Sequence, residues 1–180
     1  MTRVNKSWMA VVAAALLLGT LVGVVWARPN DRPGAAEVTR KVTLTGADFI
    51  PTQDDWDYSI GEYGSSDSSV SCLSSSCEFS APVVFPCLPS VTVERIKLHV
   101  VDEVFMNQTW VWLYRANPST GAVTSLGNLS SSYQGDPGLN TYTSGPINKV
   151  VWPSQKAYIH LDTYPNMQVY GVTVEYHRNI

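Results

Sequence analysis

Three aromatic residues at alternating positions, Trp110, Trp112 and Tyr114, are the side chains in this sequence best suited to binding a ligand. Alternate residues of a β-strand point to the same side, so the three rings would form a stripe on one face of a sheet. Such a stripe can stack on successive sugar rings of a glycan, or form an interface with another subunit or partner. It can also be core, covered by a second sheet or by residues 79–88, because large aromatic side chains are usually mostly buried.

An acidic turn formed by Asp54, Asp55 and Asp57 supplies the second set of candidate ligands. These carboxylates, together with loop carbonyls, can hold Ca²⁺, which prefers hard oxygen ligands. The sequence lacks the Asp-x-Asp-x-Asp-Gly loop with a distal Glu found in EF-hands, so a solvated acidic turn explains the same residues. Acids close in sequence also do not establish the paired geometry that glycoside hydrolysis needs. We therefore expect no resident cofactor, with calcium as the open alternative.

The three histidines, His99, His160 and His177, form no catalytic or metal-binding motif. His99 shares a polar strand face with Lys97, and His160 shares one with Asp162, so both fit ordinary surface positions. The chain has no Gly-x-Ser-x-Gly elbow, and its many serines lie in segments without a placed base. The sequence therefore favours a module that works without catalysis over a secreted hydrolase.

Three cysteines, Cys72, Cys77 and Cys87, fall in the part of the chain expected outside the cell, where disulfides persist. The short Ser-rich segment between Cys72 and Cys77 favours a local bridge, and closing so small a loop stabilises a fold by about 2 kcal/mol. Cys87 is then left over, although it can instead pair with either of the other two. A zinc site is disfavoured, because no histidine lies within ligand spacing of the cysteines.

Residues 1–27 carry the features of an export signal or a membrane anchor. Arg3 and Lys6 give a positive start, and residues 7–27 contain no charged side chain and are rich in Ala, Val and Leu. This apolar run approaches the roughly 20 residues that span a bilayer, whereas its small-residue ending at Ala27 resembles a cleavage site. In both cases the positive end stays in the cytoplasm, so the rest of the chain is expected to be secreted or exposed at the cell surface.

The remaining chain divides into a linker and one domain. Residues 28–40 combine prolines with mixed charges and predict an extended linker, and residues 41–180 suffice for one domain with its own core. Without Arg3 and Lys6, ten Lys and Arg face 15 Asp and Glu, which gives the exported part a formal net charge of −5. Cations are not clustered, so a nucleic-acid partner is disfavoured. Membrane contact is expected only through the N-terminal segment, if it stays uncleaved.

Alternating side chains predict strands along the whole domain. In residues 91–102, Ile96, Leu98 and Val100 alternate with polar residues, which predicts one buried and one solvated face. After a short connection, residues 108–115 carry the aromatic stripe on one face and aliphatic residues on the other. Further strands are expected at residues 42–45, 123–126, 157–162 and 169–176.

Two segments are expected to lie outside the sheets. Residues 79–89 are apolar but interrupted by three prolines, which predicts an extended segment crossing one end of the core and not a central strand. Residues 130–139 predict a loop. In the last strand, Tyr170 and Val172 are expected on the same face. Short strands joined by Gly, Pro, Ser and Asn predict an all-β fold, an antiparallel β-sandwich of jelly-roll or Greek-key type.

The same segments resemble a group of secreted bacterial proteins described as hypothetical exported proteins. The likeness spans residues 49–176 and rests on strand patterns at residues 79–83, Pro86, 91–102, 113–115 and 169–176. It implies an exported β-sandwich but no reaction, and it assigns no functional residue. The chain departs from the group at Leu88, Pro89 and Ser90, where members often carry a Gly-Ala pair, and in its cysteine cluster.

The sequence as a whole predicts an extracellular or cell-surface β-sandwich with a structural or partner-binding role. The alternative is a carbohydrate-binding module that uses Trp110, Trp112 and Tyr114, and a secreted hydrolase ranks third. The partners left open are a second copy of the chain or an extracellular glycan.

Overall fold

The chain forms β-strands throughout the part that the structure describes. This computed structural model describes residues 38–54, 57–61, 68–86 and 90–179. The predicted leader, most of the linker, Asp55 and Cys87 lie outside these residues. Within them, no helix is long and apolar enough to cross a membrane. The strands are β1 (Arg40–Thr45), β2 (Ile50–Pro51), β3 (Tyr58–Ile60), β4 (Val70–Cys72), β5 (Cys77–Val83), β6 (Val91–Asp102), β7 (Trp110–Ala116), β8 (Val123–Ser130), β9 (Asp136–Thr143), β10 (Lys149–Val151), β11 (Lys156–Thr163) and β12 (Met167–Arg178), with one 3₁₀ turn, η1 (Gly46–Asp48).

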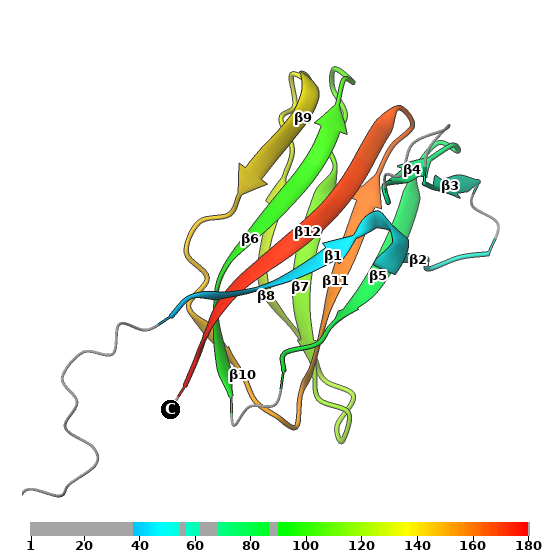
Figure 1. The fold of residues 1–180 in the computed structure, drawn as a ribbon. Coiled ribbons are helices and arrows are strands. Elements are labelled where there is room, and N and C mark those ends of the chain that lie inside the picture. The colour runs from blue at the N-terminus through cyan, green and yellow to red at the C-terminus, as the bar shows by residue number, and fades with distance from the viewer. Residues whose placement is uncertain (1–37, 55–56, 62–67, 87–89, 180) are drawn as a thin grey trace, which may run out of the picture. The chain divides into compact units, whose positions relative to one another are not determined.

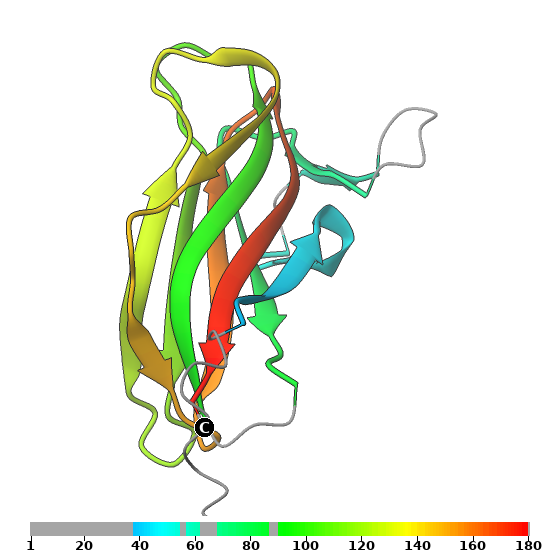
Figure 2. The same ribbon diagram turned by 60° about the vertical axis from the view of Figure 1, so that its left-hand side comes forward.

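The strands build two antiparallel sheets packed face to face, which confirms the predicted all-β sandwich. The first sheet has the order β10-β6-β12-β4-β3, with β1 also paired to β12 and β9 also paired to β6. The second sheet has the order β2-β5-β11-β7-β8. Figure 1 looks onto the first sheet with the strands of the second behind it, and Figure 2 shows the two layers from the side. The chain crosses repeatedly between the layers, as at β5 to β6 and β6 to β7.

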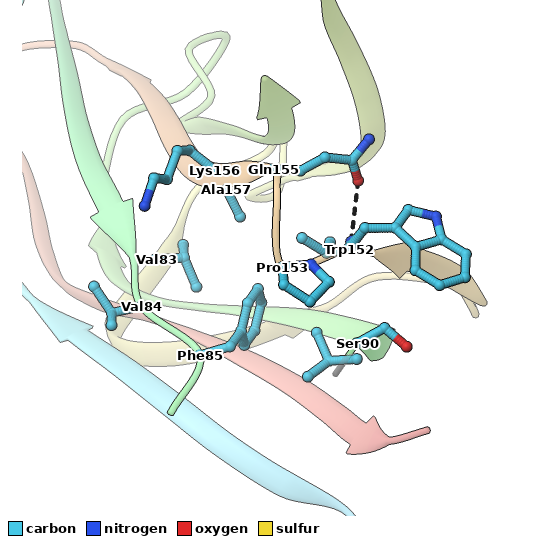
Figure 3. A pocket seen from close by; sticks show the side chains of 11 residues that line it. Val83, Val84, Phe85, Ser90, Trp152, Pro153, Gln155, Lys156 and Ala157 are labelled. Atoms are coloured by element: carbon cyan, nitrogen blue, oxygen red, sulfur yellow. Dashed lines mark hydrogen bonds between the residues drawn. The ribbon is translucent and has the colours of Figure 1, made fainter. Parts of the chain in front are cut away.

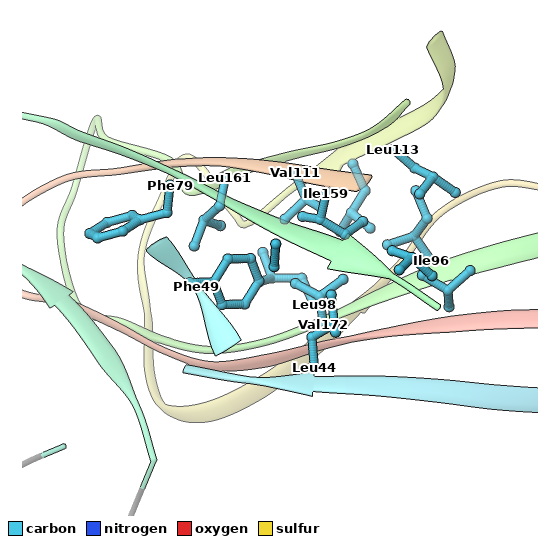
Figure 4. Close-up of a cluster of buried hydrophobic side chains, with 14 of the residues drawn as sticks. Leu44, Phe49, Phe79, Ile96, Leu98, Val111, Leu113, Ile159, Leu161 and Val172 are labelled. Atoms are coloured by element: carbon cyan, nitrogen blue, oxygen red, sulfur yellow. The ribbon is translucent and has the colours of Figure 1, made fainter. Parts of the chain in front are cut away.

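The alternation in the sequence places the core between the sheets. On β6, Ile96 and Leu98 are fully buried, and on β7 Val111 and Leu113 are fully buried from the opposite side. Figure 4 shows these side chains meeting between the layers, with Ile159 from β11 among them. Burial of each such side chain stabilises a fold by roughly 1.5–3 kcal/mol, so the inward faces of these strands fix which residues point outward.

A disulfide joins Cys72, the last residue of β4, to Cys77, the first residue of β5, with their Cα atoms 5.6 Å apart. Because β4 belongs to the first sheet and β5 to the second, the bridge closes the turn where the chain passes from one layer to the other. The Ser-rich tip between the cysteines is thus tied to both sheets.

Two segments that were expected to lie outside the sheets contain strands. The proline-interrupted segment contains β5, which pairs along its whole length with β11. The prediction was wrong because β2, on the other side of β5, pairs only at Ser80 and Phe79, so Pro82 lies where that edge is open and its missing N–H removes no ladder bond. The loop expected at residues 130–139 also contains the start of β9, which pairs with β6.

A β-bulge changes the face of one residue in β12. The pairing of β12 with β6 shifts register between Val169 and Gly171, so Val169 and Val172 are both fully buried and Tyr170 is half-buried on the outside. The prediction that Tyr170 shares the inward face of Val172 was therefore wrong.

Replacing Gly171 by Ala tests the close contact between β1 and β12. A Cβ atom at Gly171 would overlap the backbone carbonyl oxygen of Leu44. We expect Gly171→Ala to lower the free energy of unfolding by about 1–3 kcal/mol in urea denaturation, because β1 must move away from β12. Gly145→Ala is the matched control, since a Cβ there meets nothing within 4 Å. Equal stability of the two variants would contradict this packing.

Candidate functional site

The aromatic stripe lies on the outer face of the second sheet. Val111 and Leu113 point into the core from β7 and have no exposed surface, so the residues alternating with them point outward. Trp110, Trp112 and Tyr114 are each half-buried. The three rings therefore do not lie inside the core, which was one alternative from the sequence, and they are not fully exposed.

The neighbouring strand β11 widens the stripe into a two-strand aromatic face. In the β7–β11 pairing, Tyr158 lies opposite Tyr114, and His160 lies opposite Trp112. The Tyr114 and Tyr158 rings stack with centroids 5.4 Å apart, and the His160 ring lies 5.5 Å from that of Trp112. We call these five residues, Trp110, Trp112, Tyr114, Tyr158 and His160, the aromatic face.

The rings of the aromatic face support one another. Trp110 and Trp112 stack along β7 with centroids 5.7 Å apart and an angle of 16° between their planes. Near-parallel rings at this separation contact each other favourably. These ring contacts contribute to the half-burial of the indoles, which remain partly exposed to solvent.

A pair of carboxylates borders the aromatic face. Asp162 on β11 lies opposite Trp110 on one side and opposite Glu78 of β5 on the other. The His160 imidazole is near them, with its Nε2 atom 3.8 Å from a Glu78 carboxylate oxygen. Sequence analysis missed Glu78 as a site residue, because only the order of strands β5, β11 and β7 brings it to Asp162.

The environment raises the pKa values of two groups on this face. Burial raises the pKa of Asp162, the Glu78 carboxylate raises it further, and His160 acts in the opposite direction. Burial and the neighbouring Tyr114 raise the pKa of Tyr158, so its hydroxyl stays protonated and can donate a hydrogen bond.

Small polar residues flank the rings on both sides, namely Ser125, Asn128 and Ser130 on β8 and Ser80 on β5.

The outer face of the first sheet has a different chemistry. Glu175 on β12 lies 2.8 Å from the Lys97 ammonium and 3.5 Å from that of Lys41. The Lys97 hydrogen bond lowers the pKa of Glu175, and both lysine charges add to this effect. His99 is hydrogen-bonded between Thr141 and Thr173. On this face the carboxylate is paired with lysines, whereas the opposite face carries the rings and the neighbouring carboxylates Asp162 and Glu78.

The acidic turn is only partly described. Asp54 and Asp57 are exposed, and Asp55 lies outside the described residues. Among the residues that are described, no three His, Cys, Asp or Glu side chains converge as metal ligands. The calcium hypothesis for this turn therefore stays a prediction. His177, the last of the three histidines, lies elsewhere and contacts Glu94 at 2.9 Å.

A small pocket lies at one end of the sandwich. It has a volume of about 160 Å³ and lies between the end of β5 and the turn from β10 to β11. Figure 3 shows its lining, which mixes valines with Phe85, Trp152 and polar residues, and the Trp152 backbone N–H donating to the Gln155 side chain. Pockets that bury a drug-sized ligand measure roughly 300–1,000 Å³, so this one does not suit an extended chain.

No protein-family model matches the chain, and no curated protein matches it. Solved structures similar to it include the C-terminal CBM6 of a laminarinase from Zobellia galactanivorans (TM-score 0.48, 15% identity, 75% of this chain and 98% of that chain). A CBM36 domain of a xylanase from the hindgut metagenome of Trinervitermes trinervoides gives a TM-score of 0.46 at 11% identity, covering 75% of this chain and 96% of that one. A CBM36 module in complex with calcium and xylotriose gives 0.44 at 12% identity, covering 75% and 98%. These neighbours are carbohydrate-binding modules, and the likenesses are distant.

Paired substitutions on β7 test whether the aromatic face is surface or core. We expect Leu113→Ala to lower the free energy of unfolding by about 2–5 kcal/mol, because it leaves a cavity between the sheets. Trp112→Ala removes only half-buried contacts, and we expect a loss of about 1 kcal/mol in the same denaturation experiment. A loss at Trp112 as large as that at Leu113 would mean that the ring is part of the core.

Proposed function

We propose that this protein is an extracellular, non-catalytic module that binds a glycan on the aromatic face. The observation that carries the proposal is the set of five half-buried rings that two paired strands hold on the outside of one sheet. Large aromatic patches on a protein surface usually mark a binding site. The predicted export places this face outside the cell, where glycans are abundant ligands.

The spacing and chemistry of the face match those of a sugar chain. Alternate residues of a strand lie roughly 6.7 Å apart, comparable with the length of one pyranose ring, so Trp110, Trp112 and Tyr114 offer successive stacking positions. A pyranose has a C–H face that packs on an aromatic ring and a rim of hydroxyl groups. The Tyr158 hydroxyl and the polar residues of β8, Asn128 among them, lie beside the rings where that rim would fall.

Binding without catalysis is favoured by the openness of the sheet. Bond cleavage needs an acid and a base held around a substrate from which water is excluded. Glu78 and Asp162 lie side by side on a sheet surface, and the Glu78 side chain is 45% exposed. A rigid sheet is well suited to the other task, because preformed rings lose little freedom when a ligand binds.

Polysaccharide binding by the Trp112→Ala variant tests the proposal. We expect wild-type protein to be retained by at least one neutral polysaccharide in affinity electrophoresis. Trp112→Ala should weaken this binding at least tenfold, a difference of about 1.4 kcal/mol, because it removes the central ring. Trp152→Ala is the matched control, since Trp152 is 55% exposed but lies at the end pocket.

Three outcomes would contradict the proposal. Loss of binding in Trp152→Ala but not in Trp112→Ala would place the site at the end pocket. A stable dimer in light scattering that Trp112→Ala dissociates would mean that the face binds a second copy. Release of reducing ends from the polysaccharide would support the secreted hydrolase instead.

A further inference from the structure

Glu78 and Asp162 form a charged border along one end of the aromatic face. Cross-strand pairing sets Trp110, Asp162 and Glu78 side by side on strands β7, β11 and β5, all on the outside of the sheet. A chain that lies along the rings of β7 therefore passes Asp162 on the adjacent strand β11, with Glu78 one strand further on β5. This arrangement goes beyond the stacking surface itself, because it adds a charge to the place where the ligand lies.

The border is negative and poorly compensated. The groups that face Asp162 are Glu78 from β5, Trp110 from β7, and His160 two residues before it on β11. No Lys or Arg occupies these paired positions in the described strands, and His160 is the one group there able to carry a positive charge. Like charges directly opposite each other in a sheet are destabilising.

The first sheet places a carboxylate in the opposite kind of environment. There the Glu175 carboxylate is held between Lys97 and Lys41, which lowers its pKa. Burial and Glu78 instead raise the pKa of Asp162. Ionised Asp162 therefore opposes folding, and its contribution to stability is most favourable at low pH and is lost as the pH rises through its raised pKa.

We propose that Glu78 and Asp162 make the aromatic face selective for one class of glycan. The glycans that bind present hydroxyl or ammonium groups, which donate hydrogen bonds, to these two carboxylates. Glycans that present carboxylate or sulfate groups there are excluded. This inference rests on the proposed function. Ionised carboxylates only accept hydrogen bonds, so they bind hydroxyl or ammonium groups and repel anions. The aromatic rings favour the C–H faces of sugars and also attract ammonium groups, and the two acids add the repulsion of anionic ligands.

Three polymers with the same β-1,4-linked backbone test the selectivity. Hydroxyethyl cellulose is neutral, chitosan oligosaccharides carry ammonium groups, and carboxymethyl cellulose carries carboxylates. With titration calorimetry at pH 6, we expect the wild type to bind the first two at least tenfold more tightly than the third. In the Glu78→Gln/Asp162→Asn variant, binding of carboxymethyl cellulose should rise to within about threefold of that of the neutral polymer.

The outcomes separate this inference from the proposed function. If the wild type binds none of these polymers and no polysaccharide in affinity electrophoresis, both proposals fail. If it binds all three equally, or if the double variant keeps the wild-type preference, only the selectivity fails. Asp162→Asn should be at least as stable as the wild type at neutral pH in urea denaturation. A marked loss of stability would assign the carboxylate a structural role and overturn the inference.

Discussion

The alternation of side chains on β7 and β11 is the constraint on which the rest of the structure depends. On β7 the inward Val111 and Leu113 are fully buried, and on β11 Ile159 and Leu161 are fully buried as well. A register slip of one residue would move these aliphatic side chains into water and the aromatic rings into the core. The burial that stabilises the sandwich therefore also holds the aromatic face outside. Core and candidate site are two sides of the same pair of strands.

Position in the sheet explains why this face can serve as a platform. Both β7 and β11 are flanked by further strands, β8 on one side and β5 on the other, so their backbone groups are satisfied and their edges are covered. Strands held in this way lose little conformational freedom when a ligand settles on them. The rings also stack on one another, Trp110 on Trp112 and Tyr114 on Tyr158. A ligand bound there would meet a surface that is already ordered, which would reduce the entropy lost on binding.

The sequence predicted most of the fold because period-two patterns report burial directly. It placed β6, β7, β11 and β12 and the class of the fold from such patterns. It failed where local rules depend on a neighbour, since Pro82 is tolerated in β5 only because β2 is short. It also failed at Tyr170, because a β-bulge is set by pairing with β6 and leaves no mark in the alternation.

The sequence predicted only part of the candidate site, because the rest depends on how the strands pair. Trp110, Trp112 and Tyr114 are neighbours along one strand, so their spacing was enough to group them. Tyr158, Asp162 and Glu78 join them across strands, and strand order is a non-local property that a single sequence does not state.

The acidic border illustrates how a candidate site can be inferred once strand order is known. On the first sheet, the Glu175 carboxylate is matched by two lysines, as expected of a surface that only has to remain soluble. On the second sheet, Asp162 and Glu78 face each other beside a row of rings, and the pKa of Asp162 is raised. Proteins break such rules of stability mainly at functional sites, because stability alone favours replacing the charge. The unfavourable placement of these acids, more than the presence of aromatic residues, distinguishes this face from an ordinary protein surface.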